Sequence, residues 1–129
     1  MSGGWGMGAV DRSRLGAQAE EQCVEWLERA GYRIRERNWL VREGELDIVA
    51  EQDELLCFVE VRMRSSARFG DPSLTVTREK QRRVVRAALR YLQRRPAPRR
   101  MIRFDVMTVL GQGPGAVIEH LPAAFDAGM

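Results

Sequence analysis

The feature that most constrains this chain is a pair of apolar segments, residues 45–51 and 55–62, separated by only three polar residues. Two strands joined by so short a connection must lie side by side and antiparallel, as a hairpin. Both segments are almost continuously apolar around Ile48 and Phe58, a pattern typical of strands that are buried on both faces. We therefore expect the hairpin to lie at the centre of a covered sheet.

Two acidic residues, Asp47 and Glu60, interrupt this apolar hairpin. Folding the segments about their turn brings the two side chains opposite or diagonal to each other, at about 4.5–8 Å. Two carboxylates at that separation repel each other, and burial adds to the cost. A divalent cation such as Mg²⁺ or Mn²⁺ would remove the conflict, because it prefers carboxylate, carbonyl and water oxygens. Such a cation could activate water for attack on a phosphate.

Two neighbours of Glu60 would complete such a site. The backbone carbonyl of Val61 is a candidate metal ligand. Arg62 projects to the same side of the strand as Glu60, where its charge would help to neutralise a phosphate. The alternative is that Asp47 and Glu60 each pair with an arginine on the surface of a half-exposed sheet.

The remaining segments predict two helices and further strands. Helical spacing of apolar residues predicts one helix over 13–30, capped by Ser13, and a second over 77–94, ended by Pro96. Further strands are expected at 32–37 (ended by Asn38-Trp39), 102–110 and 116–121. This order favours an α/β domain with a mixed sheet of about five strands flanked by helices.

We expect a single domain over 12–122, with a flexible Gly-rich tail at 1–11 and a C-terminal tail at 123–129. The two cysteines have neither zinc-site nor Cys-x-x-Cys spacing and are predicted to be buried, reduced thiols. His120 is predicted at a surface or strand edge. No secretory signal and no apolar run of about 20 residues is present, so we expect a cytoplasmic protein that does not bind membranes.

One polar residue stands at the inward side of each predicted helix. Glu20 borders the apolar face of the first helix, and two interpretations stay open: it approaches the acidic pair, directly or through water, or it pairs with an arginine at the boundary of the core. Gln81 lies near the start of the second helix and is a candidate to point into the site.

Arginine supplies nearly all the positive charge, because the chain has 21 basic residues and only Lys80 is a lysine. On the second helix arginines recur at every fourth position. With one residue after the hairpin they form the expected nucleic-acid-binding set: Arg64, Arg78, Arg82, Arg86 and Arg90. Such a row can follow a phosphate backbone, with binding that depends on salt and not on sequence. The alternatives are a solvated helix face and a codon bias towards arginine.

Several segments together resemble the YraN-like family of uncharacterised proteins, over residues 16–121. They include Gly44-Glu45-Leu46-Asp47-Ile48-Val49-Ala50, Phe58-Val59-Glu60-Val61-Arg62, Arg37-Asn38-Trp39, Lys80-Gln81 and Arg103-Phe104-Asp105-Val106. That family resembles archaeal Holliday junction resolvases and the restriction-endonuclease-like superfamily. The resemblance implies a three-layer nuclease fold, a divalent-metal-dependent endonuclease that acts on DNA, including branched DNA, and a homodimer. It maps the metal ligands onto Asp47 and Glu60 and the acid of the first helix onto Glu20.

One position departs from the superfamily pattern, which has a lysine two residues after the second acid, where this chain has Arg62. Arginine keeps the charge but cannot release its proton. The alternative function is therefore a nucleic-acid-binding module that retains the nuclease fold without turnover. A third hypothesis is a protein-interaction domain with no nucleic-acid role.

Overall fold

The computed structural model describes residues 9–64 and 76–127. Its elements are α1 (Ala9–Arg29), β1 (Arg33–Val41), β2 (Gly44–Gln52), β3 (Leu55–Arg64), α2 (Arg78–Arg94), β4 (Met101–Leu110), the short 3₁₀ turn η2 (Gly113–Gly115) and β5 (Val117–Phe125). The order of helices and strands is the predicted one. No helix in this part of the chain is long and apolar enough to cross a membrane.

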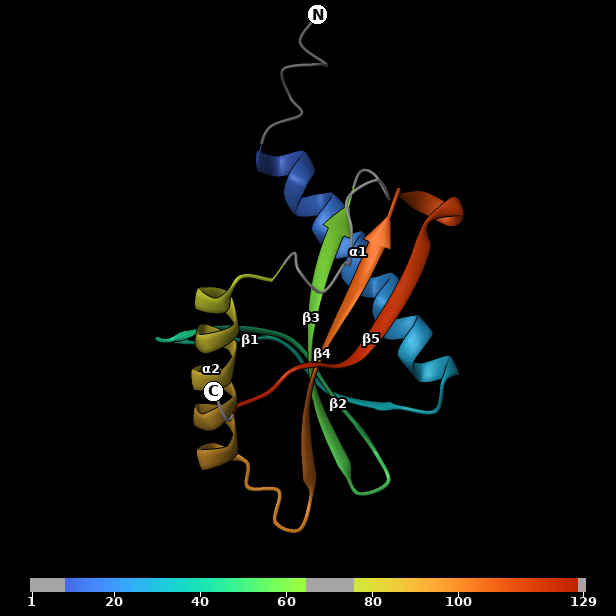
Figure 1. Cartoon of the computed structure of the whole chain (residues 1–129). Coiled ribbons are helices and arrows are strands. Elements are labelled where there is room, and N and C mark those ends of the chain that lie inside the picture. Colours follow the sequence, from blue (N-terminus) through green and yellow to red (C-terminus); the bar gives the residue numbers. More distant parts are fainter. Residues whose placement is uncertain (1–8, 65–75, 128–129) are drawn as a thin grey trace, which may run out of the picture.

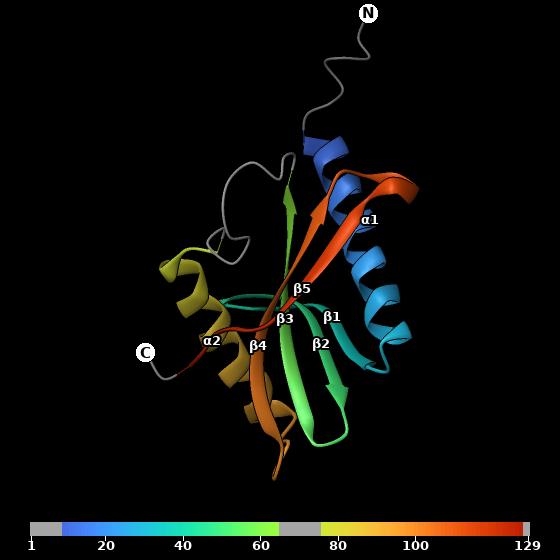
Figure 2. The same ribbon diagram turned by 45° about the vertical axis from the view of Figure 1, so that its right-hand side comes forward.

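The five strands form one mixed sheet in the order β1-β2-β3-β4-β5. Neighbouring strands are antiparallel except β3 and β4, which are parallel. A parallel pair requires a crossover connection, and the segment that contains α2 makes it. Figures 1 and 2 show α1 on one side of the sheet and α2 on the other. The predicted α/β architecture is confirmed, and it is consistent with a three-layer restriction-endonuclease-like fold.

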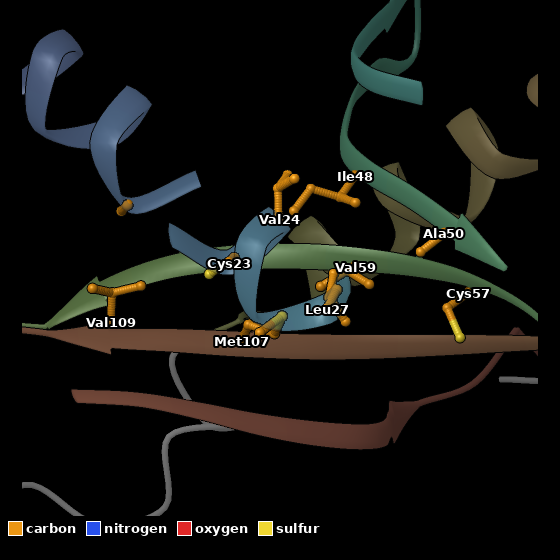
Figure 3. Packing of buried hydrophobic residues seen from close by; sticks show 10 residues of the cluster. Cys23, Val24, Leu27, Ile48, Ala50, Cys57, Val59, Met107 and Val109 are labelled. Carbon is orange, nitrogen blue, oxygen red and sulfur yellow. The ribbon is translucent and has the colours of Figure 1, made fainter. Parts of the chain in front are cut away.

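Each helix covers one face of the sheet with its own core. Under α1, Cys23 and Leu27 pack with Ile48, Val59 and Met107 (Figure 3). The core under α2 is richer in aromatic residues, and its members include Val84, Tyr91, Leu46, Phe58 and Phe104. Successive residues of β3 thus enter opposite cores, so this strand is buried on both faces, as its continuous apolar run predicts.

The predicted hairpin is present as β2 and β3, paired from Gln52–Leu55 to Ile48–Val59. Asp53 in its turn has a φ of 53°, a left-handed conformation that Asp tolerates better than most residues. Cys23 and Cys57 are both buried and free, as predicted. Burial is the main cause that raises the pKa of each thiol to about 12.

Two predicted boundaries near the N-terminus were wrong. The first helix begins at Ala9 and includes Ser13, which therefore does not cap it; residues 9–12 contain no helix breaker. Residues 9–11 of the predicted tail are thus helical, and the rest of that tail lies outside the described residues. β1 does not end at Asn38-Trp39 but continues to Val41, because Asn38 takes a left-handed φ of 50° inside the strand.

One predicted boundary near the C-terminus was also wrong. β5 continues to Phe125, so part of the predicted tail belongs to the sheet. Pro122 is tolerated there because β5 is an edge strand, and Phe125 stacks on Phe104 with ring centroids 5.3 Å apart. For His120 the predicted strand-edge position is confirmed, since it lies on the edge strand β5, but it is not at the surface, because its side chain is only 9% exposed.

His120 belongs to a group of donors around the fully buried carboxylate of Asp105 on β4. Its Nε2 lies 2.7 Å from Oδ2, Arg103 donates to both carboxylate oxygens at 2.8 and 2.7 Å, and the Ala123 N–H donates at 3.0 Å. Burial alone would raise the pKa of Asp105, but these hydrogen bonds outweigh it and hold the pKa below its ordinary range. Asp105 therefore ties β5 to β4.

We expect Asp105→Asn to lower the free energy of unfolding by about 3 kcal/mol or more at pH 7, because it leaves buried donors facing an amide instead of a carboxylate. Chemical denaturation followed by circular dichroism measures this. Since the folded-state pKa is lowered, the parent's advantage is present above about pH 4 and is lost as the pH falls further. Asp53→Asn, in an exposed turn, is the control and should change stability by less than about 0.5 kcal/mol. Equal effects of the two substitutions would contradict the assignment.

Candidate functional site

The candidate site lies where β2 leaves β3. The ladder between these strands ends at Ile48–Val59, after which β3 pairs only with β4 and β2 only with β1. Figure 1 shows the β1–β2 hairpin and the end of β3 turning in different directions. Beyond the ladder, Asp47 Oδ2 accepts a hydrogen bond of 2.9 Å from the backbone N–H of Val61. A side-chain carboxylate thus replaces the missing backbone partner of β3.

Glu60 lies beside Asp47 and is almost fully buried, with 2% of its surface exposed. Burial first, and then the charge of Asp47, raise the pKa of Glu60 to about 8, against a partly offsetting attraction from Lys80. The two acids are therefore brought together, as strand pairing predicts, and their proximity is unfavourable when both are ionised. The interpretation as surface ion pairs does not hold for Glu60, since its partner is no arginine and the group is not on the surface.

The positive group beside Glu60 is Lys80, on the first turn of α2. Its Nζ lies 3.2 Å from Glu60 Oε1, and its side chain is 37% exposed. The Thr77 hydroxyl caps this turn by accepting from the Lys80 N–H at 3.1 Å. No role for Lys80 was predicted from the sequence. The signal that could have pointed to it is that it is the one lysine of an arginine-rich chain.

Glu20 reaches the same region from α1 and is buried. Asn38 donates to its Oε1 at 2.7 Å, and the nearest Arg37 nitrogen lies 3.8 Å from the same oxygen. Burial is the main cause that raises the pKa of Glu20; the hydrogen bond from Asn38 opposes it, and the charge of Asp47 adds to it. Both interpretations of Glu20 thus have support, since it faces Asp47 and also pairs weakly with an arginine. Asn38, whose left-handed backbone aims it at Glu20, was not predicted.

A cavity of about 580 Å³ lies against Glu20, Asn38 and Asp47, whereas Glu60 and Lys80 are not part of its lining. Its lining combines three acids, an amide, one cation and small or apolar residues: Glu20, Glu45, Asp47, Asn38, Arg62, Gly16, Ala17, Val61 and Met63. Arg62 makes no ion pair with any residue in the described ranges, so its guanidinium is available to an anion. A second cavity of about 450 Å³, lined by Arg64 among others, contains no acidic residue and has no comparable chemistry.

These groups suit a hard divalent cation held mainly by solvent and by two carboxylates. Within 9–64 and 76–127, no three His, Cys, Asp or Glu side chains stand together so as to hold a metal ion. Mg²⁺, however, is commonly bound through one or two carboxylates, with waters and substrate phosphate as its other ligands. Asp47 and Glu60 supply such a pair, and all possible donors are oxygen atoms. Burial first, and then the charge of Asp47, raises the pKa of Glu60, and a bound cation would oppose both effects.

The other predicted site residues fall in different places. The Gln81 amide donates to the Val76 carbonyl at 3.0 Å, so it holds the segment before α2 and does not line the acidic cavity. Arg78, Arg82 and Arg86 are exposed on α2 and have no ion pair within the described part of the chain. Arg90, the last of the predicted row, donates to Glu43 at 3.0 Å and so binds the end of the β1–β2 hairpin. Residues 65–75, which follow β3 in the sequence, lie outside the described residues.

Comparison with known proteins identifies relatives along nearly the whole chain. A family model described as "Uncharacterised protein family UPF0102" matches residues 19–109. A UPF0102 protein of Myxococcus xanthus is 57% identical over 120 residues, which cover 93% of this chain and 95% of that protein. UPF0102 proteins of Anaeromyxobacter dehalogenans and Geobacter metallireducens are 44% and 43% identical, covering 98% and 92% of this chain and 94% and 97% of their own. The names of these relatives state no activity, and the predicted family resemblance is confirmed.

In metal-free buffer we expect Glu60→Gln to raise the melting temperature by several degrees at pH 8 and by much less at pH 5. The pKa of Glu60 is about 8 in the folded chain against an ordinary 4.5, so the parent loses stability as the pH rises between these values. The glutamine side chain is uncharged at every pH, so the variant does not lose this stability. Thermal unfolding of both proteins with EDTA, at the two pH values, measures the difference. Glu54→Gln, in the exposed β2–β3 turn, should show no such trend, and a pH-independent effect of Glu60→Gln would contradict the assignment.

Proposed function

The chain belongs to the uncharacterised protein family UPF0102, and from the geometry of its own site we propose that it is a divalent-metal-dependent endonuclease acting on DNA. The observation that carries this proposal is the close approach of two carboxyl groups, the buried Glu60 and the half-buried Asp47, to which the described part of the chain gives one ammonium group as a counter-charge. At a purely structural site, apolar residues in place of buried charged groups are often equally or more stabilising. Retaining the acidic pair makes sense if a cation binds there.

In the proposed site Asp47 and Glu60 hold Mg²⁺ or Mn²⁺, and the carbonyl of Val61 is a further candidate ligand. A bound ion of this kind would lower the pKa of a water molecule and stabilise charge on the phosphate. The chain's own groups orient the ligands: the Val61 N–H fixes Asp47, and Asn38 fixes Glu20. Glu20 is then placed to hold a water molecule at the cavity wall, and Arg62 to receive a phosphate oxygen.

DNA binding is proposed for the outward face of α2. Arg78, Arg82 and Arg86 stand one turn apart along the helix that also carries Lys80 into the site. A phosphate backbone that follows this row would pass Lys80 and lead towards Glu60, with affinity from charge and little dependence on sequence. Branched DNA as the preferred substrate, a homodimer and a cytoplasmic location stay predictions from the sequence and its resemblance.

A second candidate function is a nucleic-acid-binding module without turnover. It is favoured by the absence of a third carboxylate close enough to complete a metal-binding group within the described ranges. Binding and cleavage are separable, so the two candidate functions make different predictions.

For cleavage, we expect the parent protein to cut labelled junction, flap or duplex DNA in Mg²⁺ or Mn²⁺, and Asp47→Ala to lower the rate at least about 100-fold. Mn²⁺ should also raise the melting temperature of the parent, and Asp47→Ala should abolish that increase. Glu54→Ala controls for the loss of an acidic residue outside the site. If the parent cuts every substrate no faster than Asp47→Ala does, the nuclease is excluded and the binding module remains.

For binding, we expect Arg82→Ala and Arg86→Ala each to weaken DNA affinity and to reduce the slope of log K against log salt by about one. The reason is that each substitution removes one guanidinium that would neutralise one phosphate. Fluorescence anisotropy across a series of salt concentrations measures the slope. Arg29→Ala, which removes the same charge from the end of α1, is the matched control. If all three variants have the parent's slope, the row on α2 is only a solvated face.

A further inference from the structure

The cation that contacts the acidic pair comes from α2. The sequence pattern predicted it instead at Arg62, two residues after Glu60 in β3. Arg62 follows Glu60 by two residues, yet its charge is not among those that act on the pKa of Glu60, whereas Lys80 lowers that pKa both by its charge and by a hydrogen bond. Lys80 belongs to α2, which lies some twenty residues further along the chain. The capped first turn of α2 and the core beneath it fix where this ammonium group stands.

Resting on the proposed function, we propose that Lys80 is the cationic catalytic residue of the site and contacts the phosphate at the metal, while Arg62 only binds substrate in the cavity. The ammonium group of Lys80 reaches the buried Glu60 at 3.2 Å while more than a third of its side chain meets solvent. It therefore stands at the boundary between the acidic pair and the surface. A lysine has three donors and can give one to Glu60 and another to a phosphate oxygen.

Charge balance supports this assignment. Binding of a divalent cation requires both carboxyl groups to be ionised, so Asp47, Glu60 and Lys80 together carry one negative charge. A divalent ion changes the sum to one positive charge, which a single phosphodiester neutralises. Without Lys80 the same group would be neutral and would attract the phosphate less. Arg62 does not enter the sum, because its charge is not among the causes that shift the pKa of Glu60.

The position of Arg62 supports a different role for it. It lines the cavity and has no ion pair in the described part of the chain, so its substitution leaves no buried acid unpaired. Arginine cannot give up its proton and presents a planar fork to phosphate, which suits binding of a substrate's flanking phosphate. Loss of Arg62 should therefore weaken substrate affinity more than turnover.

Because Lys80 is the one lysine, ¹³C-labelled lysine gives a single side-chain signal in the NMR spectrum of the full chain. We expect substoichiometric Mn²⁺ to broaden this signal in the parent but not in Asp47→Ala, and a short DNA duplex to shift it in the parent and in Arg62→Met. A signal that responds to neither Mn²⁺ nor DNA overturns the inference. The measurement uses the native chain, so it does not depend on whether a Lys80 variant folds.

Steady-state cleavage then compares Lys80→Met with Arg62→Met. We expect Lys80→Met to lower kcat at least about 100-fold, Lys80→Arg to restore part of it, and Arg62→Met to raise KM with less than about a tenfold loss of kcat. Equal kcat in Lys80→Met and the parent overturns the inference while the nuclease stands. A parent that cuts nothing, but whose lysine signal responds to Mn²⁺ and DNA, refutes the nuclease and keeps Lys80 as the phosphate contact.

Discussion

The repulsion between the carboxyl groups of Asp47 and Glu60 is the interaction around which the rest of the site is arranged. It arises because two strands that are buried on both faces each carry one acid where their ladder ends. Nearby groups reduce the cost only in part: the Val61 N–H satisfies Asp47, and Lys80 gives Glu60 one counter-charge. Burial first, and then this repulsion, raises the pKa of Glu60, and acids perturbed in this way are common at functional sites.

In the three-layer arrangement, residues of the site come from both faces of the sheet. From the α1 layer come Glu20 and the wall of the acidic cavity. From the α2 layer come Lys80 and the exposed arginines. The crossover through α2 makes this possible, because it leads from β3, which carries Glu60, to the neighbouring parallel strand β4. The site therefore depends on the order of the strands as well as on the residues in them.

A second buried acid, Asp105, gives a useful contrast with Glu60. Both are almost fully buried, yet the pKa of Asp105 is lowered and that of Glu60 is raised. The difference lies in their partners: Asp105 accepts hydrogen bonds from Arg103, His120 and a backbone N–H, whereas Glu60 has one ammonium group and an acidic neighbour. Burial alone thus does not mark a functional acid; a lack of compensating donors does.

The sequence by itself determined the elements and the pairing at the centre of the fold. A two-residue period and a short polar turn placed Asp47 near Glu60, and a 3.6-residue period put Glu20 at the border of a core, because these periods fix which side of an element a residue faces. These periods do not reveal local exceptions. Two examples are the left-handed Asn38 inside β1 and the continuation of β5 past Pro122.

Tertiary structure alone decided which groups from distant elements meet. Periodicity shows that a side chain points inward but not what it will touch, so it could not distinguish Lys80 from Gln81, neighbours on the same helix turn. Packing of α2 on the sheet brought the lysine to Glu60 and turned the glutamine to the Val76 carbonyl. The acidic pair was a property of one hairpin, whereas its counter-charge was a property of the whole fold.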